Sequence, residues 1–358
     1  MLSRVRLGWK RFWAKGTLSS REVDVAEMSK RDRLAAAIAG EAVDRAPVAL
    51  WRHFPGDDQR PADLAAATLS FQWRWDWDFV KVTPASSFCV RDWGVEDRWV
   101  GNDEGTREYT RRAIEGPEDW RQLPVLDARE GALGGQLRCL EKIVAELGQD
   151  TPVIQTIFSP LSQAKNLAGN ERLLVHMRRY PEALKAGLET VTQTTSRFIR
   201  LALKTGIDGI FYAVQHARYE FMSEATYAEF GRPYDLRLFE VLGGSEAWFN
   251  VLHLHGDEVM FDLLAEYPVQ AWNWHDQETP PSLAEGRRKV KGAVVGGLRQ
   301  WETMLRGDPE QVRAEARAAM EQTGGRGFIL GTGCVTPITA PWANLRAVRE
   351  VVEVQSGE

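Results

Sequence analysis

Short apolar segments recur along the chain, and a stretch with helical character follows each of them. The segments are mostly β-branched or aromatic and almost continuously apolar, as is typical of parallel strands buried on both faces. The pattern therefore predicts an α/β protein. We predict eight strands, at Val48–Trp51, Phe79–Val82, Val153–Phe158, Gly209–Tyr212, Phe249–Leu252, Val269–Trp272, Ala293–Val295 and Phe328–Leu330.

The segments between these strands carry helix start and stop signals. Asp308–Glu310 combines an N-cap, a first-turn proline and an early acid, and Gly324–Gly325 closes the same helix. Pro181–Lys204 is typical of a long helix that ends before Gly206. Strands alternating with helices in this way predict a single-domain, closed (β/α)8 barrel of the TIM type, although an open doubly wound sheet would give a similar pattern.

About seventy residues separate the second and third predicted strands, which is more than one crossover helix requires. Within them, Arg98–Val100 and Arg107–Tyr109 flank the turn-like segment Gly101–Thr106. This arrangement predicts a β-hairpin. We expect an excursion that leans over the barrel mouth; the alternative is a surface hairpin without a role.

The start of the folded domain is marked by a helix cap. Ser29 followed by Asp32 is typical of an N-cap that opens an apolar-periodic helix. The preceding basic stretch Arg4–Lys15 lacks the continuous apolar core of a signal peptide. We therefore predict a loosely ordered extension over residues 1–27 and one domain over residues 28–358.

Composition narrows the class of protein. The net charge of -5 and the pI near 5.8 lack the basic excess of a nucleic-acid-binding surface. No apolar run approaches the ~20 residues of a membrane helix. Cys89, Cys139 and Cys334 form no CxxC pair, which favours a reducing, cytoplasmic location. No glycine-rich nucleotide-binding motif occurs, and Ser86–Ser87 lacks the context of a nucleophile elbow.

Histidines gather where catalytic groups lie in a barrel of this type, at the C-terminal ends of the strands. Of the six histidines, only His176 falls in a predicted helix. The other five follow predicted strands: His53, His216, His253, His255 and His275. Cys334 follows the last strand, so the mouth of the predicted barrel carries imidazole and thiol groups that could take part in catalysis.

His253, His255 and Cys334 form the sharpest of these groups. Residues two apart on an extended segment point to the same face, so both imidazoles can reach one point. Two histidines and one cysteine suit zinc, and three protein ligands leave a fourth position for water or substrate. The alternative is a hydrogen-bonded core histidine beside an inert cysteine.

A second group, Trp274–Asp276, follows the sixth strand. An imidazole beside a carboxylate can act as a general base or orient a substrate. Adjacent residues on an extended chain point apart, so His275 and Asp276 need not form a dyad. We predict that one of them moves a proton and that Trp274 contacts the substrate.

Other polar residues at the mouth are candidates for substrate binding. Cations there suit a carboxylate-bearing ligand, and amides or imidazoles can donate hydrogen bonds to a polar one. Surface ion pairs and solvated loops are the alternatives. The candidates are Arg52, His53, Lys81, Gln215 and His216.

Several motifs, in order along nearly the whole chain from Met28, resemble the uroporphyrinogen decarboxylase superfamily. They are Arg31–Leu34 with Asp44–Val48, Tyr227–Phe230 with Arg232–Tyr234, Leu252–Gly256, and Gly331–Pro337 with Pro341–Leu345. The resemblance implies a distorted (β/α)8 barrel. It also implies one of two activities: cofactor-free decarboxylation of uroporphyrinogen III, or zinc-dependent methyl transfer between a corrinoid protein and a thiol such as coenzyme M.

The methyltransferases of this superfamily resemble the chain at the metal motif, where a His-x-Cys and a distant Gly-Cys supply zinc ligands. His253 matches the histidine and Cys334 the distant cysteine, while His255 replaces the middle cysteine. The replacement makes the site less thiolate-rich and more Lewis acidic. The resemblance therefore supports metal binding more directly than it supports transfer to a thiol.

The decarboxylase pattern matches less well. Of its Arg-x-x-Gly-Arg-Tyr motif after the first strand, only Arg52 is kept. Where the decarboxylases carry an aspartate after strand two, this chain has Thr83–Ser86, and Thr332 replaces the histidine of their closing Gly-His-Gly. Without that carboxylate, a protonated pyrrole intermediate lacks its stabilising group.

The leading hypothesis is therefore a cytoplasmic, zinc-dependent enzyme that moves a methyl or similar one-carbon group. The expected partners are a small-molecule substrate, a corrinoid protein as methyl donor or acceptor and a second copy of the chain, with no nucleic acid and no membrane. The alternatives are metal-free decarboxylation of uroporphyrinogen or a related carboxylate and non-catalytic binding of a tetrapyrrole or corrinoid.

Overall fold

A computed structural model describes residues 27–353 of the chain, so nearly all of the predicted N-terminal extension lies outside the described residues. Seven strands form one curled parallel sheet in the order β1-β4-β5-β6-β7-β8-β9. Each strand pairs with the next one of the sheet along the chain, as expected for repeated βα units. The strands are β1 (Val80–Val82), β4 (Val153–Phe158), β5 (Gly209–Val214), β6 (Val251–Leu254), β7 (Ala271–Trp274), β8 (Ala293–Leu298) and β9 (Phe328–Thr332).

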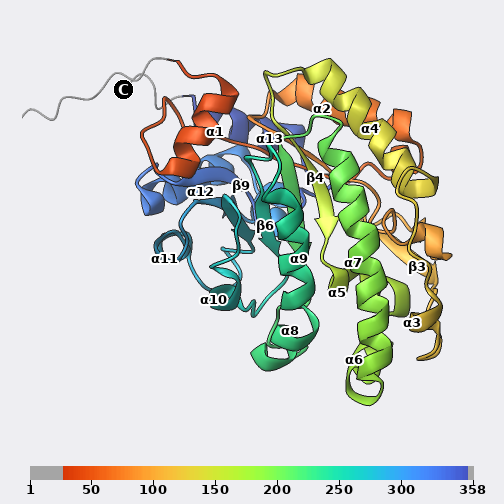
Figure 1. Cartoon of the computed structure of the whole chain (residues 1–358). Coiled ribbons are helices and arrows are strands. Elements are labelled where there is room, and N and C mark those ends of the chain that lie inside the picture. The colour runs from red at the N-terminus through yellow and green to blue at the C-terminus, as the bar shows by residue number, and fades with distance from the viewer. Residues whose placement is uncertain (1–26, 354–358) are drawn as a thin grey trace, which may run out of the picture.

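Helices lie around the outside of the curled sheet (Figure 1). Every residue of the seven strands is buried, which explains why their sequences are almost continuously apolar. Among residues 27–353, no helix is both long and apolar enough to span a membrane. The helices are α1 (Lys30–Ala39), α2 (Pro61–Trp75), α3 (Asp119–Gln122), α4 (Gly131–Leu147), α5 (Pro160–Ala168), α6 (Asn170–Arg179), α7 (Pro181–Leu203), α8 (Glu224–Phe230), α9 (Arg232–Leu242), α10 (Phe261–Leu264), α11 (Leu283–Lys289), α12 (Pro309–Thr323) and α13 (Trp342–Val351), with short turns η1 (Asp57–Gln59), η2 (Arg91–Trp93) and η3 (Gln300–Leu305).

The predicted helix caps are confirmed. The Ser29 side chain accepts a hydrogen bond from the backbone N–H of Asp32 at the start of α1. Asp308 caps α12 in the same way, and Gly324 ends that helix in the left-handed conformation. The long helix predicted over Pro181–Lys204 is α7.

The predicted strand over Val48–Trp51 is the main difference from the expected fold. Only Val48 forms a bridge, to Leu330 of β9. Pro47 has no N–H to donate, and the N–H of Val48 donates to the Asp78 carboxylate at 2.7 Å rather than to a strand. The sheet therefore contains seven strands instead of eight.

This short segment nevertheless joins the two edges of the sheet. The N–H of Ala49 donates to the carbonyl of Leu330 at 3.0 Å, and the N–H of Leu330 donates to the carbonyl of Pro47 at 2.8 Å. On the other side, the N–H of Asp78, just before β1, donates to the carbonyl of Val48 at 2.9 Å. Hydrogen bonds thus connect β9 through this segment to the start of β1.

A buried ion-pair network fixes the joining segment. The Asp78 carboxylate, which is 0 % exposed, accepts hydrogen bonds at 2.7 Å from Arg33, Arg45 and the backbone N–H of Val48. Arg33 also pairs with Asp44 at 2.7 Å. The arginines that resemble the opening motif of the superfamily therefore hold the sheet edges together.

We expect Asp78→Asn to destabilise the fold by about 3–5 kcal/mol, because it leaves the buried Arg33 and the partly buried Arg45 without their shared counter-charge. Asp76→Asn is the matched control, because its carboxylate is 60 % exposed and its surface ion pairs contribute less than about 1 kcal/mol. The measurement is the free energy of unfolding from chemical denaturation. Equal effects of the two substitutions would contradict the role assigned to Asp78.

The predicted hairpin is confirmed as β2 (Glu96–Trp99) paired antiparallel with β3 (Arg107–Arg111). Its tip packs against the loop that follows β9. The carbonyl of Asp103 accepts from the N–H of Ile338 at 2.7 Å, and the Asp103 carboxylate accepts from the Thr339 hydroxyl at 2.8 Å. Because Cys334 belongs to the same loop, the hairpin lies over the end of the sheet where the predicted site residues gather.

Candidate metal centre and its cavity

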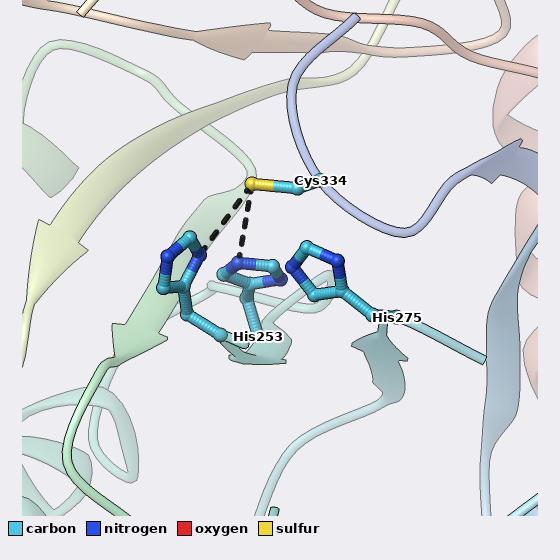
Figure 2. A group of neighbouring side chains, drawn as sticks. His253, His275 and Cys334 are labelled. Carbon is cyan, nitrogen blue, oxygen red and sulfur yellow. Dashed lines mark hydrogen bonds between the residues drawn. The ribbon is translucent and has the colours of Figure 1, made fainter. Parts of the chain in front are cut away.

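Four side chains at the strand ends form a compact group of metal-ligating type. One ligand atom from each of His253, His255, His275 and Cys334 lies within 4.8 Å of the other three. The Cys334 sulfur is 3.7 Å from Nε2 of His253 and 3.6 Å from Nδ1 of His255. Figure 2 shows the labelled side chains of His253, His275 and Cys334 pointing toward a common space. The predicted convergence of two imidazoles and one thiol is confirmed.

The β6 strand and the turn after β9 position these groups. His253 lies within β6, and His255 follows one residue after the strand ends. The turn that carries Cys334 approaches very closely, because a Cβ atom on Gly333 would lie 2.9 Å from the carbonyl oxygen of Trp274 and 2.8 Å from Cα of His275. Glycine is therefore required there for the sulfur to reach the imidazoles.

Asn273, on β7 opposite His253, sets the tautomer of that imidazole. Its amide nitrogen donates to the carbonyls of Val295 at 2.9 Å and Thr332 at 3.1 Å. Its oxygen therefore faces Nδ1 of His253, 2.6 Å away, and accepts a hydrogen bond from it. Nε2 of His253 is left with a free lone pair that points toward Cys334, as a metal ligand requires.

His275, which the sequence offers together with Asp276 as a candidate for proton transfer, is the fourth donor of this group. Its Nδ1 lies 3.8 Å from the Glu278 carboxylate. Its Nε2 is buried and has no hydrogen-bond partner among residues 27–353. A buried polar atom without a partner is rare, and a bound metal or ligand would satisfy it.

Burial keeps the group uncharged. It lowers the pKa of His253 well below the ordinary value, that of His255 to about 3 and that of His275 to about 4, and neighbouring imidazoles add to the shift at His253 and His255. Burial, together with the charge of Glu104, raises the pKa of the Cys334 thiol to about 12. The imidazoles are thus ready to bind a metal at neutral pH, whereas the thiol must first lose its proton.

The donor set fits zinc. Imidazole nitrogen and thiolate sulfur are its usual protein ligands, and zinc tolerates mixed tetrahedral sets of this kind. Hard oxygen-seeking cations such as Mg²⁺ and Ca²⁺ do not fit, because none of the four donors is an oxygen. The hydrogen bond from His253 to Asn273 supplies the outer-shell support that such sites need.

A cavity of about 290 Å³ opens beside these donors. Its wall combines aromatic side chains with a few charged ones. The hairpin contributes Glu104, Thr106, Arg107 and Tyr109 to the wall, which confirms that it leans over the mouth. Other wall residues include Trp51, Lys81, Thr83, Pro84, Ser86, Lys165 and Phe211.

Among the predicted substrate-binding residues, His53, Lys81 and Gln215 line this cavity. Burial and the nearby Lys81 charge lower the pKa of His53 to about 3, so its imidazole is neutral. Burial lowers the pKa of Lys81 to about 7. These three residues remain candidates for contact with a ligand.

Arg52 and His216 do not line the cavity. The Arg52 guanidinium donates to the carbonyl of Ile338 at 3.1 Å and so fixes the loop after β9. Nε2 of His216 lies 3.1 Å from the side-chain oxygen of Asn170. Both residues support the site's surroundings instead of facing its interior.

The structure also places Trp274 and Asp276 outside the cavity wall. The Trp274 indole is fully buried and donates to the carbonyl of Pro281 at 2.9 Å. The Asp276 carboxylate accepts from the N–H of Gly297 at 3.1 Å, which links the ends of β7 and β8. The expected roles of Trp274 in substrate contact and of Asp276 in proton transfer do not match these positions. Adjacent side chains on an extended segment point apart, and of the three residues only His275 faces the other metal-ligating side chains.

The sequence interpretation missed Glu104, Lys165 and Asn273. Glu104 comes from the hairpin tip, and Lys165 lies in α5. Their approach to the cavity depends on how distant segments pack. For Asn273 a signal existed, because it lies on the strand next to His253, but its register could not be derived from the pattern.

The family model of uroporphyrinogen decarboxylase (URO-D) matches residues 29–354, so the chain belongs to this family. The chain is 22 % identical over 345 residues to the methylcobamide:CoM methyltransferase MtbA of Methanosarcina mazei, which covers 90 % of this chain and 97 % of that protein. It is 28 % identical over 275 residues to the uroporphyrinogen decarboxylase of Saccharopolyspora erythraea, covering 70 % and 72 %. Both activities named by the resemblance therefore occur among its relatives.

Solved structures share the fold. A methyltransferase from Methanosarcina mazei superposes with a TM-score of 0.80 at 20 % identity, covering 92 % of this chain and 100 % of the other. A B12-independent methionine synthase from Shewanella sp. W3-18-1, in complex with selenomethionine, gives a TM-score of 0.58 at 14 % identity, covering 87 % and 93 %. These likenesses concern the architecture alone.

We expect zinc binding at pH 7 to release about one proton, because only the Cys334 thiol is still protonated there. The apparent affinity should accordingly rise about tenfold per pH unit between pH 6 and 8. Calorimetric titration in buffers of different ionisation enthalpy measures the released protons. Cys334→Ala should bind weakly and without proton release. Zinc binding by the unchanged protein with no release would contradict the assignment of Cys334 as a ligand.

We expect Gly333→Ala to weaken zinc binding by about tenfold or more, because its methyl group would push the Cys334 turn away from His275. Gly243→Ala is the control, since the nearest atom to its added methyl is an ordinary 3.6 Å away. Competition with a chromophoric chelator gives both affinities. Unchanged affinity in Gly333→Ala would show that the turn does not limit the approach of the sulfur.

Proposed function

We propose that this URO-D family protein is a zinc-dependent enzyme that transfers a methyl or similar one-carbon group between a donor and a small thiol. The observation that carries the proposal is the group of imidazole and thiol donors, of which His253, His255 and Cys334 line a cavity of ligand size and His275 lies behind them outside its wall. The names of the methyltransferase relatives support methyl transfer, and the donor set supports zinc.

His253, His255 and Cys334 would hold the metal. With one thiolate and two neutral imidazoles, the zinc site would keep one net positive charge, which would lower the pKa of a substrate thiol and hold it as a thiolate. The fourth position is then left for the substrate sulfur. This assignment differs from the superfamily's two-cysteine pattern only in the imidazole of His255.

We assign His275, which adjoins the other donors, as the acceptor of the thiol proton. Its Nε2 has no partner among the described residues, and the Glu278 carboxylate near Nδ1 would stabilise the imidazolium that forms. The sulfur gains a bond to the methyl carbon as the bond from carbon to the donor breaks, and the donor keeps that electron pair. The hairpin covers part of this space, since its tip is bonded to the loop after β9.

The cavity size bears on the methyl donor. About 290 Å³ is at the low end of the range for small-molecule sites and does not admit a whole tetrapyrrole or corrin ring. A corrinoid would therefore present its methyl group from the rim, with only the thiol inside. We propose a corrinoid protein as the partner that brings it.

We expect the purified protein to hold one zinc ion, and Cys334→Ala to lose zinc affinity by more than about 100-fold together with methyl transfer from methylcobalamin to a thiol. Cys139→Ala is the control, because Cys139 is buried in α4 and belongs to no donor group among residues 27–353. Elemental analysis and the absorbance change of methylcobalamin are the measurements. Zinc-free protein, or full activity in Cys334→Ala, would refute the proposal.

The role of His275 has its own test. If His275 accepts the proton, His275→Ala should keep its full zinc content but transfer the methyl group at least about 100-fold more slowly. Rates over a range of pH should also lose the dependence that this imidazole imposes. Loss of zinc from His275→Ala would instead make His275 a fourth ligand and leave the proton to another group.

Decarboxylation of a small carboxylate is the second candidate. The unpaired Lys81 at the cavity and the decarboxylase relative favour it. Against it, Thr83, Pro84 and Ser86 line the cavity where the decarboxylases are expected to carry a carboxylate. Carbon dioxide release that survives a chelator would favour this candidate over methyl transfer.

A further inference from the structure

Lys81 brings to the cavity, from β1, a buried amine without an ion-pair partner, and burial lowers the pKa of this amine to about 7. Its side chain is 8 % exposed, and Nζ lies 4.6 Å from the ring centre of Phe211 and 5.9 Å from that of Trp51. Within residues 27–353 it has neither a hydrogen-bond acceptor nor a carboxylate partner. Burying an ammonium without a counter-charge is costly, and an anionic group of a ligand would offset that cost.

Glu104 brings an unpaired carboxylate to the same cavity from the hairpin tip. The carboxylate accepts a hydrogen bond from the Thr106 hydroxyl at 3.3 Å and forms no ion pair with the described residues. The backbone on both sides is fixed, because Asp103 is bonded to Ile338 and a Cβ on Gly105 would lie 2.8 Å from that of His53. The carboxylate is therefore held at the cavity by the fold.

The other charged residues of the wall do not replace Lys81 and Glu104 as the groups that select a ligand by its charges. Arg107 is already paired with Asp97 at 2.5 Å and with Asp58 at 3.5 Å. Lys165 is a second cation of the wall without an ion-pair partner in the described part of the chain, so an anionic group on the ligand is favoured twice. Glu104 would repel a purely anionic ligand. It would attract the cationic group of a ligand that carries both charges.

We propose that the thiol substrate is a zwitterion, carrying both a carboxylate and an ammonium group. The inference deepens the proposed function and rests on it. The thiol sulfur lies at the metal position, Lys81 binds the carboxylate, and Glu104 binds the ammonium. The Trp51 and Phe211 rings contact the hydrocarbon between these groups. Charge-assisted contacts at two fixed points give both affinity and orientation.

Three thiols that carry their charged groups on the third carbon from the sulfur test this inference. L-homocysteine carries both charged groups, 4-mercaptobutyrate lacks the ammonium, and 3-aminopropane-1-thiol lacks the carboxylate. In the protein loaded with cobalt(II) in place of zinc, a bound thiolate gives a charge-transfer band whose titration yields each dissociation constant. We expect L-homocysteine to bind at least about tenfold more tightly than either analogue.

The variants separate the two contacts. Glu104→Gln should weaken the binding of L-homocysteine by about tenfold and leave the binding of 4-mercaptobutyrate unchanged or tighter. Lys81→Met should weaken the binding of both of these carboxylate-bearing thiols by a similar factor. Glu108→Gln, an exposed position on the same hairpin, is the control and should change none of the three.

Binding of 4-mercaptobutyrate as tight as that of L-homocysteine would overturn the inference. An equal loss of affinity for L-homocysteine and 4-mercaptobutyrate in Glu104→Gln would also overturn it. Either result leaves the proposed function standing, because a thiolate still reaches the metal. If the protein holds no metal, or if no thiol gives the band, the proposed function fails and the inference fails with it.

Discussion

The curl of the parallel sheet is the constraint on which the candidate site depends. His253 is on β6 and Cys334 follows β9, with β7 and β8 between them in the sheet. In a flat sheet with strands about 4.8 Å apart, these positions would be separated by about 14 Å. The curl brings the sulfur to 3.7 Å from the imidazole. Whatever stabilises the curl therefore also stabilises the donor group.

The two ends of the chain divide this task. The opening motif supplies Arg33 and Arg45, which bind Asp78 and hold the segment that joins the sheet edges. The closing motif supplies Gly333 and Cys334, whose close turn carries the sulfur over the strand ends. One motif acts at the beginning of the strands and the other at their end, as expected in this architecture, where stability and chemistry lie on opposite faces. The opening motif stabilises the sheet and the closing motif positions the thiol, and these two roles explain why both motifs resemble those of the family.

Much of this arrangement could be predicted from the order of apolar segments. That order placed His253, His255 and Cys334 at one mouth, and the alternation of an extended chain placed the two imidazoles on one face. Two predicted strands lie two residues too early, at β6 and β7, because apolar residues that pack before each strand resemble the strand itself. The position of Glu104 could not be derived, since it depends on packing between the hairpin tip and a loop more than two hundred residues later.

In the proposed methyl transfer, the replacement of a middle cysteine by His255 would change what the rest of the site must contribute to the reaction. A zinc site with one thiolate keeps more positive charge than a site with two, so it would bind a substrate thiolate more tightly and lower its pKa further. The nucleophilicity of a thiolate falls with its pKa, so that gain in binding slows attack on the methyl carbon. Orientation can recover the loss, because holding two reacting groups in line removes part of the entropic barrier. Charged groups fixed on two different walls, Lys81 on β1 and Glu104 on the hairpin, are suited to that task.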